Sequence, residues 1–234
     1  MMLNRRLWVA SVVSAASMAC AHPISPLAHQ QCANADARLA ATLPPLETLR
    51  AGGCTGINGS ECARLQREVE RLAVICPGHV PTLMANAVLA YDDRRAELSQ
   101  QYLDQILAQP RNHPDAAALR ARIAIEEGNL PFARRLLEQQ IKLAPDHSGL
   151  RETYAAELYL DGKMPRAVEE LTMAAALGAP GWRVAYHRGL IEEASGRLSE
   201  AGRYYAEALQ GNPGWAPAQS RLKALRARET PTAP

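Results

Sequence analysis

An interval of 34 residues governs the second half of this chain. A small residue, a turn glycine, an alanine and a large residue each recur at that interval. The positions are Ala121, Ala155 and Gly189; Gly128, Gly162 and Gly196; Ala133, Ala167 and Ala201; and Leu137, Leu171 and Tyr205. Chemically distinct positions that share one period indicate repeated copies of one supersecondary unit. The period therefore predicts a stacked array rather than a compact globule.

The order of residues within one repeat predicts two helices joined by a turn. Glycine suits the left-handed conformation that ends the first helix, as at Gly128. The small residue lets the two helices approach closely, and the large residue fills the space beside that contact. Proline near the end of each unit, at Pro145, Pro180 and Pro213, stops the second helix. Because one hairpin cannot bury its apolar stripe alone, neighbouring hairpins are expected to share a core.

These units resemble the tetratricopeptide repeat family, which places small residues, glycine and proline at the same points of a helical hairpin. The resemblance implies an all-α fold, a right-handed α-solenoid of stacked helical hairpins. The unit at 79–113 is a degenerate repeat that lacks the turn glycine. The expected division is a signal peptide at 1–19, a disulfide-stapled N-terminal hairpin at 22–78, repeats at 79–113, 114–147, 148–181 and 182–215, a C-terminal capping helix at 216–228 and a flexible tail at 229–234.

The amino terminus reads as an export signal. Arg5 and Arg6 form a positive head, and residues 7–19 are an apolar stretch too short to span a membrane. The sequence that ends at Cys20 resembles the lipobox of bacterial lipoproteins, which implies lipidation of Cys20 and an outer-membrane location. The alternative is an ordinary signal-peptidase cut after Ala21. We therefore expect an exported, periplasmic protein, anchored as an outer-membrane lipoprotein.

Cysteine content agrees with export. Four cysteines follow the signal segment: Cys32, Cys54, Cys62 and Cys76. An even number in an exported chain predicts two disulfides. A helix expected over 61–75, capped by Ser60, places Cys62 and Cys76 about 21 Å apart, which is too far for a disulfide.

The remaining pairings depend on the opposing arm of this hairpin. If residues 33–49 form an antiparallel helical arm, broken at Pro44–Pro45, the cysteines meet in pairs at its two ends. The favoured disulfides are then Cys32–Cys76 and Cys54–Cys62. The crossed pairing, Cys32–Cys62 with Cys54–Cys76, fits such a hairpin less well. A zinc site is disfavoured because the spacings lack a short ligand pair.

Charge and motifs argue against nucleic-acid binding and catalysis. The net charge is +2, and removal of Arg5 and Arg6 leaves 24 basic and 24 acidic residues with no basic run. Metalloprotease, Walker and nucleophile-elbow motifs are missing from the sequence. His79, His113 and His147 recur every 34 residues, but each follows a helix-ending proline and is expected to serve a turn or helix start. We expect no catalytic residue, metal or cofactor.

The resemblance implies that a partner lies against the first helix of each repeat. The predicted groove residues are Arg122, Ile125, Glu152, Tyr159, Arg183, Tyr186 and Glu193. The remaining slots of the family pattern hold Asp115, Ala118, Gly149, Ala156 and Leu190. Tyrosine and arginine favour binding hot spots, although a solvated face with incidental tyrosines is the alternative. The family's basic clamp for a peptide carboxy terminus has no match.

These features predict a non-enzymatic protein–protein interaction scaffold in the bacterial envelope. Its partner is expected to be another envelope protein, of which it binds a segment during assembly of a pilus, secretion or envelope complex. The alternative is a regulator that binds and activates a cell-wall enzyme.

Overall fold

The computed structural model describes residues 32–229. All regular secondary structure in that range is helical, as the sequence predicts. The helices are α2 (Ala35–Ala51), the short 3-10 helix η1 (Gly56–Asn58), α3 (Gly59–Ile75), α4 (Val80–Asp92), α5 (Ala96–Leu107), α6 (Pro114–Glu126), α7 (Leu130–Leu143), α8 (Ser148–Leu160), α9 (Met164–Ala176), α10 (Gly181–Ala194), α11 (Leu198–Gly211) and α12 (Ala216–Glu229). The predicted signal segment and Cys20 lie outside the described residues. None of the helices within 32–229 is long and apolar enough to cross a bilayer.

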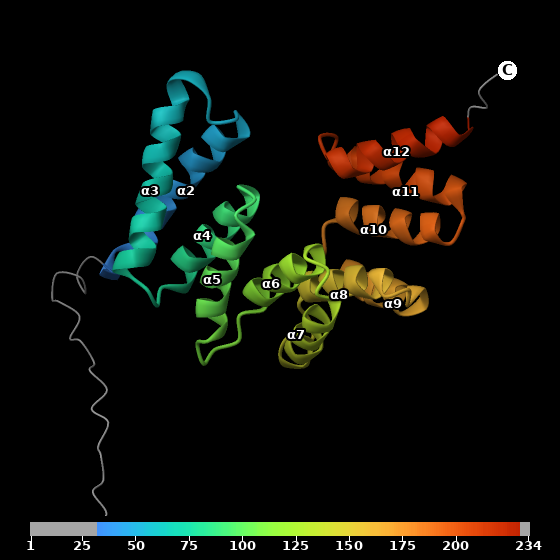
Figure 1. The fold of residues 1–234 in the computed structure, drawn as a ribbon, viewed down its shortest axis with the longest axis horizontal. Coiled ribbons are helices and arrows are strands. Elements are labelled where there is room, and N and C mark those ends of the chain that lie inside the picture. The colour runs from blue at the N-terminus through green and yellow to red at the C-terminus, as the bar shows by residue number, and fades with distance from the viewer. Residues whose placement is uncertain (1–31, 230–234) are drawn as a thin grey trace, which may run out of the picture.

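Consecutive helices pair as hairpins, and each hairpin packs on the next one along the chain. The pairs are α2–α3, α4–α5, α6–α7, α8–α9 and α10–α11, and α12 packs on α11. In Figure 1 the pairs follow an open arc, from α2–α3 at one end, through α6–α7, to α10–α12 at the other. The expected α-solenoid with a terminal capping helix is therefore the architecture of the chain.

The turns within the hairpins depend on a left-handed residue. Gly128, Gly162 and Gly196 have φ values of 78°, 75° and 77°. The degenerate unit places Arg94 at the equivalent position, and this arginine adopts φ 61°. The N–H of Arg95 then donates to the carbonyl of Ala90 at 2.8 Å, as in the glycine turns. The unit without glycine thus keeps the same turn, at the energetic cost of a non-glycine residue with positive φ.

A small residue faces a large one where the two helices of each repeat meet. The pairs are Ala87–Leu103, Ala121–Leu137, Ala155–Leu171 and Gly189–Tyr205, and all eight residues are buried. In the last pair a Cβ at position 189 would lie 2.5 Å from Cε1 of Tyr205. The missing side chain of Gly189 therefore makes room for the larger ring of Tyr205.

Helix α2 is continuous through Pro44 and Pro45, so the predicted break is wrong. Leu39, Thr42 and Leu46 form one buried stripe at helical spacing on both sides of the prolines. The prolines themselves are exposed. Packing of the stripe against α3 holds the helix together despite the two missing N–H donors.

Helix α3 begins at Gly59 with Asn58 at its N-cap, and neither residue receives a side-chain cap. Ser60 lies inside the helix, so the predicted Ser60 cap is also wrong. The physical reason is that η1 runs directly into α3 and starts the helix before Ser60 is reached.

Two disulfides join the ends of the α2–α3 hairpin, with the favoured pairing. Cys32–Cys76 spans 44 residues and Cys54–Cys62 spans 8, with Cα–Cα distances of 5.4 and 5.7 Å. Loop-closure entropy gives about 4 kcal/mol for the long loop and about 2.5 kcal/mol for the short one. The long bridge therefore contributes most to the stability of this hairpin, whose own core is small.

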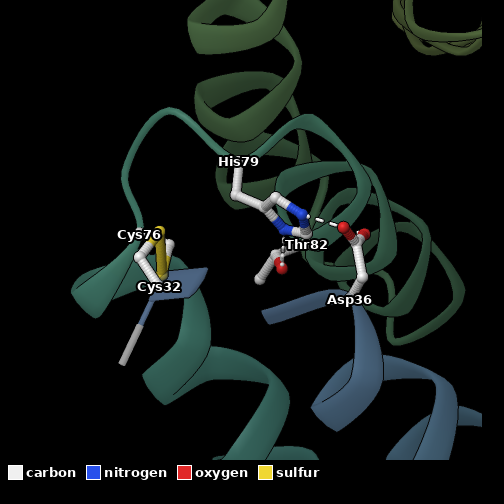
Figure 2. The surroundings of a disulfide bond; sticks show 5 residues. All are labelled: Cys32, Asp36, Cys76, His79 and Thr82. Atoms are coloured by element: carbon white, nitrogen blue, oxygen red, sulfur yellow. Dashed lines mark hydrogen bonds and ion pairs between the residues drawn. A yellow bond between two sulfur atoms is a disulfide. The ribbon is translucent and has the colours of Figure 1, made fainter. Parts of the chain in front are cut away.

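The recurring histidines stand at helix starts, as predicted. The N–H of Leu150 donates to Nδ1 of His147 at 3.2 Å, and His147 Nε2 lies 3.0 Å from Oδ1 of Asp115. His79 contacts Thr82 and Asp36 in a similar way, beside the Cys32–Cys76 bridge (Figure 2). Each of these two histidines therefore links the start of one first helix to the first helix of the preceding unit.

Replacement of Gly189 by alanine should lower the free energy of unfolding by about 1–3 kcal/mol, because the new methyl group overlaps the Tyr205 ring. The double variant Gly189→Ala/Tyr205→Leu recreates the Ala155–Leu171 pair and should recover part of that loss. Urea denaturation of the single and double variants measures the coupling.

Gly181→Ala serves as the control, because a Cβ at position 181 meets no atom within 4 Å. Single-variant losses that simply add in the double variant would contradict the close contact of this pair.

Candidate partner-binding groove

A groove made of three adjoining hollows follows the first helices of successive hairpins. The first hollow, of ≈ 500 Å³, lies between α2 and α4 and is lined mainly by apolar side chains such as Leu43, Met84 and Val88. The second, of ≈ 270 Å³, extends across α4 and α6 to the start of α8. The third, of ≈ 390 Å³, lies among α6, α8, α10 and the start of α12.

The hollows share lining residues and therefore form one groove. Met84 and Val88 border the first and second hollows. Tyr91, Arg122 and Arg183 border the second and third. Such continuity offers an elongated surface, as an extended or helical peptide segment requires.

Five of the seven predicted groove residues line the third hollow: Arg122, Ile125, Glu152, Arg183 and Tyr186. Ala156 joins them there, and Asp115, Ala118 and Gly149 line the second hollow. The first-helix positions that the repeat pattern selects are thus brought together by the stacking of α6, α8 and α10. Their role in binding stays a prediction.

The other two predicted residues are not among those lining the hollows. Tyr159 is half-buried and packs against the largest core cluster. Glu193 accepts a hydrogen bond from the Tyr205 hydroxyl at 2.7 Å and lies 3.5 Å from Arg221. Leu190, a further slot of the pattern, packs in the same core cluster as Tyr205. Toward the end of α8 and α10, this face is covered by the packing of the next elements.

Solved structures with this architecture are all repeat proteins of one kind. A thermophilic tetratricopeptide repeat protein of Thermus thermophilus matches 80% of this chain and 98% of its own, with a TM-score of 0.65 and 17% identity. A tetratricopeptide repeat protein of Parabacteroides merdae matches 88% of this chain and 87% of its own, with a TM-score of 0.61 and 18% identity. The chain has the tetratricopeptide repeat fold. No protein-family model and no curated protein matches the sequence.

A buried carboxylate stands at the centre of the third hollow of this tetratricopeptide repeat array. Glu152 is 1% exposed, and its Oε1 accepts a hydrogen bond from Nε of Arg183 at 2.7 Å. Nε2 of His187 lies 3.2 Å from the same oxygen. Burial alone would raise the pKa of Glu152, but the hydrogen bond from His187 and the charges of Arg183, His187 and Arg122 hold it below 4.5. Glu152 therefore stays ionised and fixes Arg183 against α8.

Arg122 differs from Arg183 because nothing neutralises it directly. Within residues 32–229, its guanidinium makes no hydrogen bond or ion pair, although its side chain is half-buried between the second and third hollows. Burial lowers the pKa of Arg183, and the like charge of Arg122 adds to that effect. The two arginines thus face the same space.

Several lining residues escaped the repeat pattern. Tyr91 comes from the degenerate unit, and His187 follows Tyr186 on α10. Trp215 comes from the join before α12, where its ring stacks on Tyr186 at 5.5 Å and meets Trp182 at 4.0 Å. The near-repeat of the two tryptophans, 33 residues apart, is the signal that indicates this cluster in the sequence.

Replacement of Glu152 by glutamine should lower the free energy of unfolding by about 2 kcal/mol at neutral pH, because the buried partner of Arg183 loses its charge. The folded-state pKa of Glu152 is depressed, so its stabilisation is present above 4.5 and is lost as pH falls through the folded-state pKa. The gap between wild type and variant should therefore shrink as urea unfolding is repeated from neutral pH down to about pH 3.

Glu169→Gln is the matched control, because Glu169 is exposed on α9. A gap that stays constant with pH, or an equal loss in the control, would show that the charge of Glu152 does not stabilise the fold.

Proposed function

We propose that this chain is a non-enzymatic protein–protein interaction scaffold whose groove holds a segment of another protein. The observation that carries the proposal is the continuous groove, in which half-buried Arg122 lacks a neutralising partner among residues 32–229 and Tyr186 offers an aromatic surface. Arginine and tyrosine are the residues that dominate binding energy at protein interfaces. Both are held on rigid helices, which lowers the entropy cost of binding.

The shape of the groove favours a polypeptide over a small ligand. Hollows of ≈ 500, ≈ 270 and ≈ 390 Å³ follow one another along five successive first helices and the start of α12. An extended or helical segment can place one side chain in each hollow while its backbone follows the groove. A compact cofactor would instead call for one enclosed cavity.

We further propose that the scaffold is exported and anchored at the outer membrane through Cys20. Its client is then another envelope protein, bound during assembly of a pilus, secretion or envelope complex. Support comes from the signal-like segment at 1–19 and from the two disulfides between Cys32 and Cys76, since disulfides persist in oxidising compartments.

A photo-crosslinking amino acid at Ala156, in the third hollow, should capture the client in intact cells. The same amino acid at Arg135, exposed on the second helix α7, provides the matched control. Mass spectrometry of the adducts identifies the captured protein. Equal capture at both positions, or capture at Arg135 alone, would place the interaction surface outside the groove.

Metabolic labelling with a palmitate analogue should label the protein in cells, and Cys20→Ala should abolish the label. The substitution removes the only thiol that a lipoprotein signal could modify at this point, and the outer-membrane fraction should lose the protein. Unlabelled wild-type protein, with cleavage after Ala21, would mean that the chain is periplasmic without a lipid anchor.

A further inference from the structure

The charges along the groove are unevenly partnered. The third hollow is lined by three arginines, Arg94, Arg122 and Arg183, and by two carboxylates, Glu126 and Glu152. Both carboxylates are already engaged. Arg183 and His187 contact Glu152, and Glu126 accepts a hydrogen bond from the hydroxyl of Tyr91.

The remaining arginines have no such engagement. Within residues 32–229, the side chains of Arg94 and Arg122 make no hydrogen bond or ion pair. Arg94 is exposed at the edge of the hollow, whereas Arg122 is half-buried beside Arg183. Two like charges against a low-dielectric wall create a positive potential that an anion would relieve.

The opposite end of the groove has another character. The first hollow is lined mostly by apolar side chains, among them Leu39, Leu43 and Met84. Its charged rim carries Glu47, Arg50 and Asp92, and Arg50 is bound to Asp93 at 2.7 Å. The potential therefore changes from acidic at the first hollow to basic at the third.

We infer that the groove binds an acidic polypeptide segment in one orientation, with a carboxylate side chain seated on Arg122 beside Arg183 and aliphatic side chains in the first hollow. This inference rests on the proposed function and specifies the chemistry of its partner. Charge-assisted hydrogen bonds from a guanidinium to a carboxylate are short and directional, so they give both affinity and register. Aromatic contact with Tyr186 and Trp215 completes the basic end.

Selection from a random peptide library displayed on phage, against the immobilised full chain, tests the inference. Peptides enriched on the wild type should carry an excess of aspartate and glutamate, with leucine-like residues on one side of the acidic positions. Arg122→Gln should weaken their binding by about tenfold. Arg122→Glu should remove the acidic excess from the selected peptides and should favour lysine in its place.

Matched controls separate this effect from a general change of charge. Arg135→Gln and Arg135→Glu make the same substitutions on exposed α7, away from the groove, and should leave the selected peptides unchanged. Circular dichroism of each variant confirms that it is folded. The more conservative Arg122→Gln keeps the test decisive if Arg122→Glu, close to Glu152, fails to fold.

The outcomes distinguish this inference from the proposed function. Ala156→Trp fills the third hollow, so peptides that need the groove should no longer bind this variant. Groove-dependent peptides without acidic excess would overturn the acidic partner and leave the scaffold intact. Peptides that ignore both Arg122 and Ala156, or an absence of enriched peptides, would overturn both. Displacement of the peptides by inorganic phosphate, but not by chloride of equal ionic strength, would reassign the arginines to a phosphate site.

Discussion

The contact between a small residue of the first helix and a large residue of the second sets the geometry on which the rest of this molecule depends. It fixes how closely α8 approaches α9, and its recurrence at Ala87, Ala121, Ala155 and Gly189 makes successive hairpins nearly equivalent. Equivalent hairpins stack with their first helices in line, so side chains at matching positions meet across repeats. The groove is the direct result of this alignment, because no single hairpin contains it.

Within the groove, order and availability are divided between two arginines. Arg183 is committed to Glu152, a buried carboxylate that stays ionised because His187 and Arg183 stabilise its charge. Arg122 has no such commitment among the described residues. A rigid, satisfied ion pair beside an unsatisfied cation is an arrangement in which binding can gain energy without first breaking a contact.

Much of the fold follows from the sequence, because period, turn chemistry and cysteine spacing agree with one another. The exceptions are local. Burial of Leu39 and Leu46 overrides the helix-breaking tendency of Pro44–Pro45, and Arg94 accepts a left-handed turn that favours glycine. The repeat pattern located Arg122 and Glu152, but it placed Glu193 in the groove although the core claims that residue. Trp215 was missed because it comes from a join, where helical periodicity carries no information.

The Cys32–Cys76 bridge also changes how the molecule responds to mechanical load. Tension applied through the chain that precedes Cys32 crosses the covalent bridge to Cys76 and enters the array at α4. Helices α2 and α3 then lie on a side branch of the path of force. A scaffold tethered by its amino terminus can thus be pulled without unzipping its first hairpin, and the adjoining apolar hollow keeps its shape under strain.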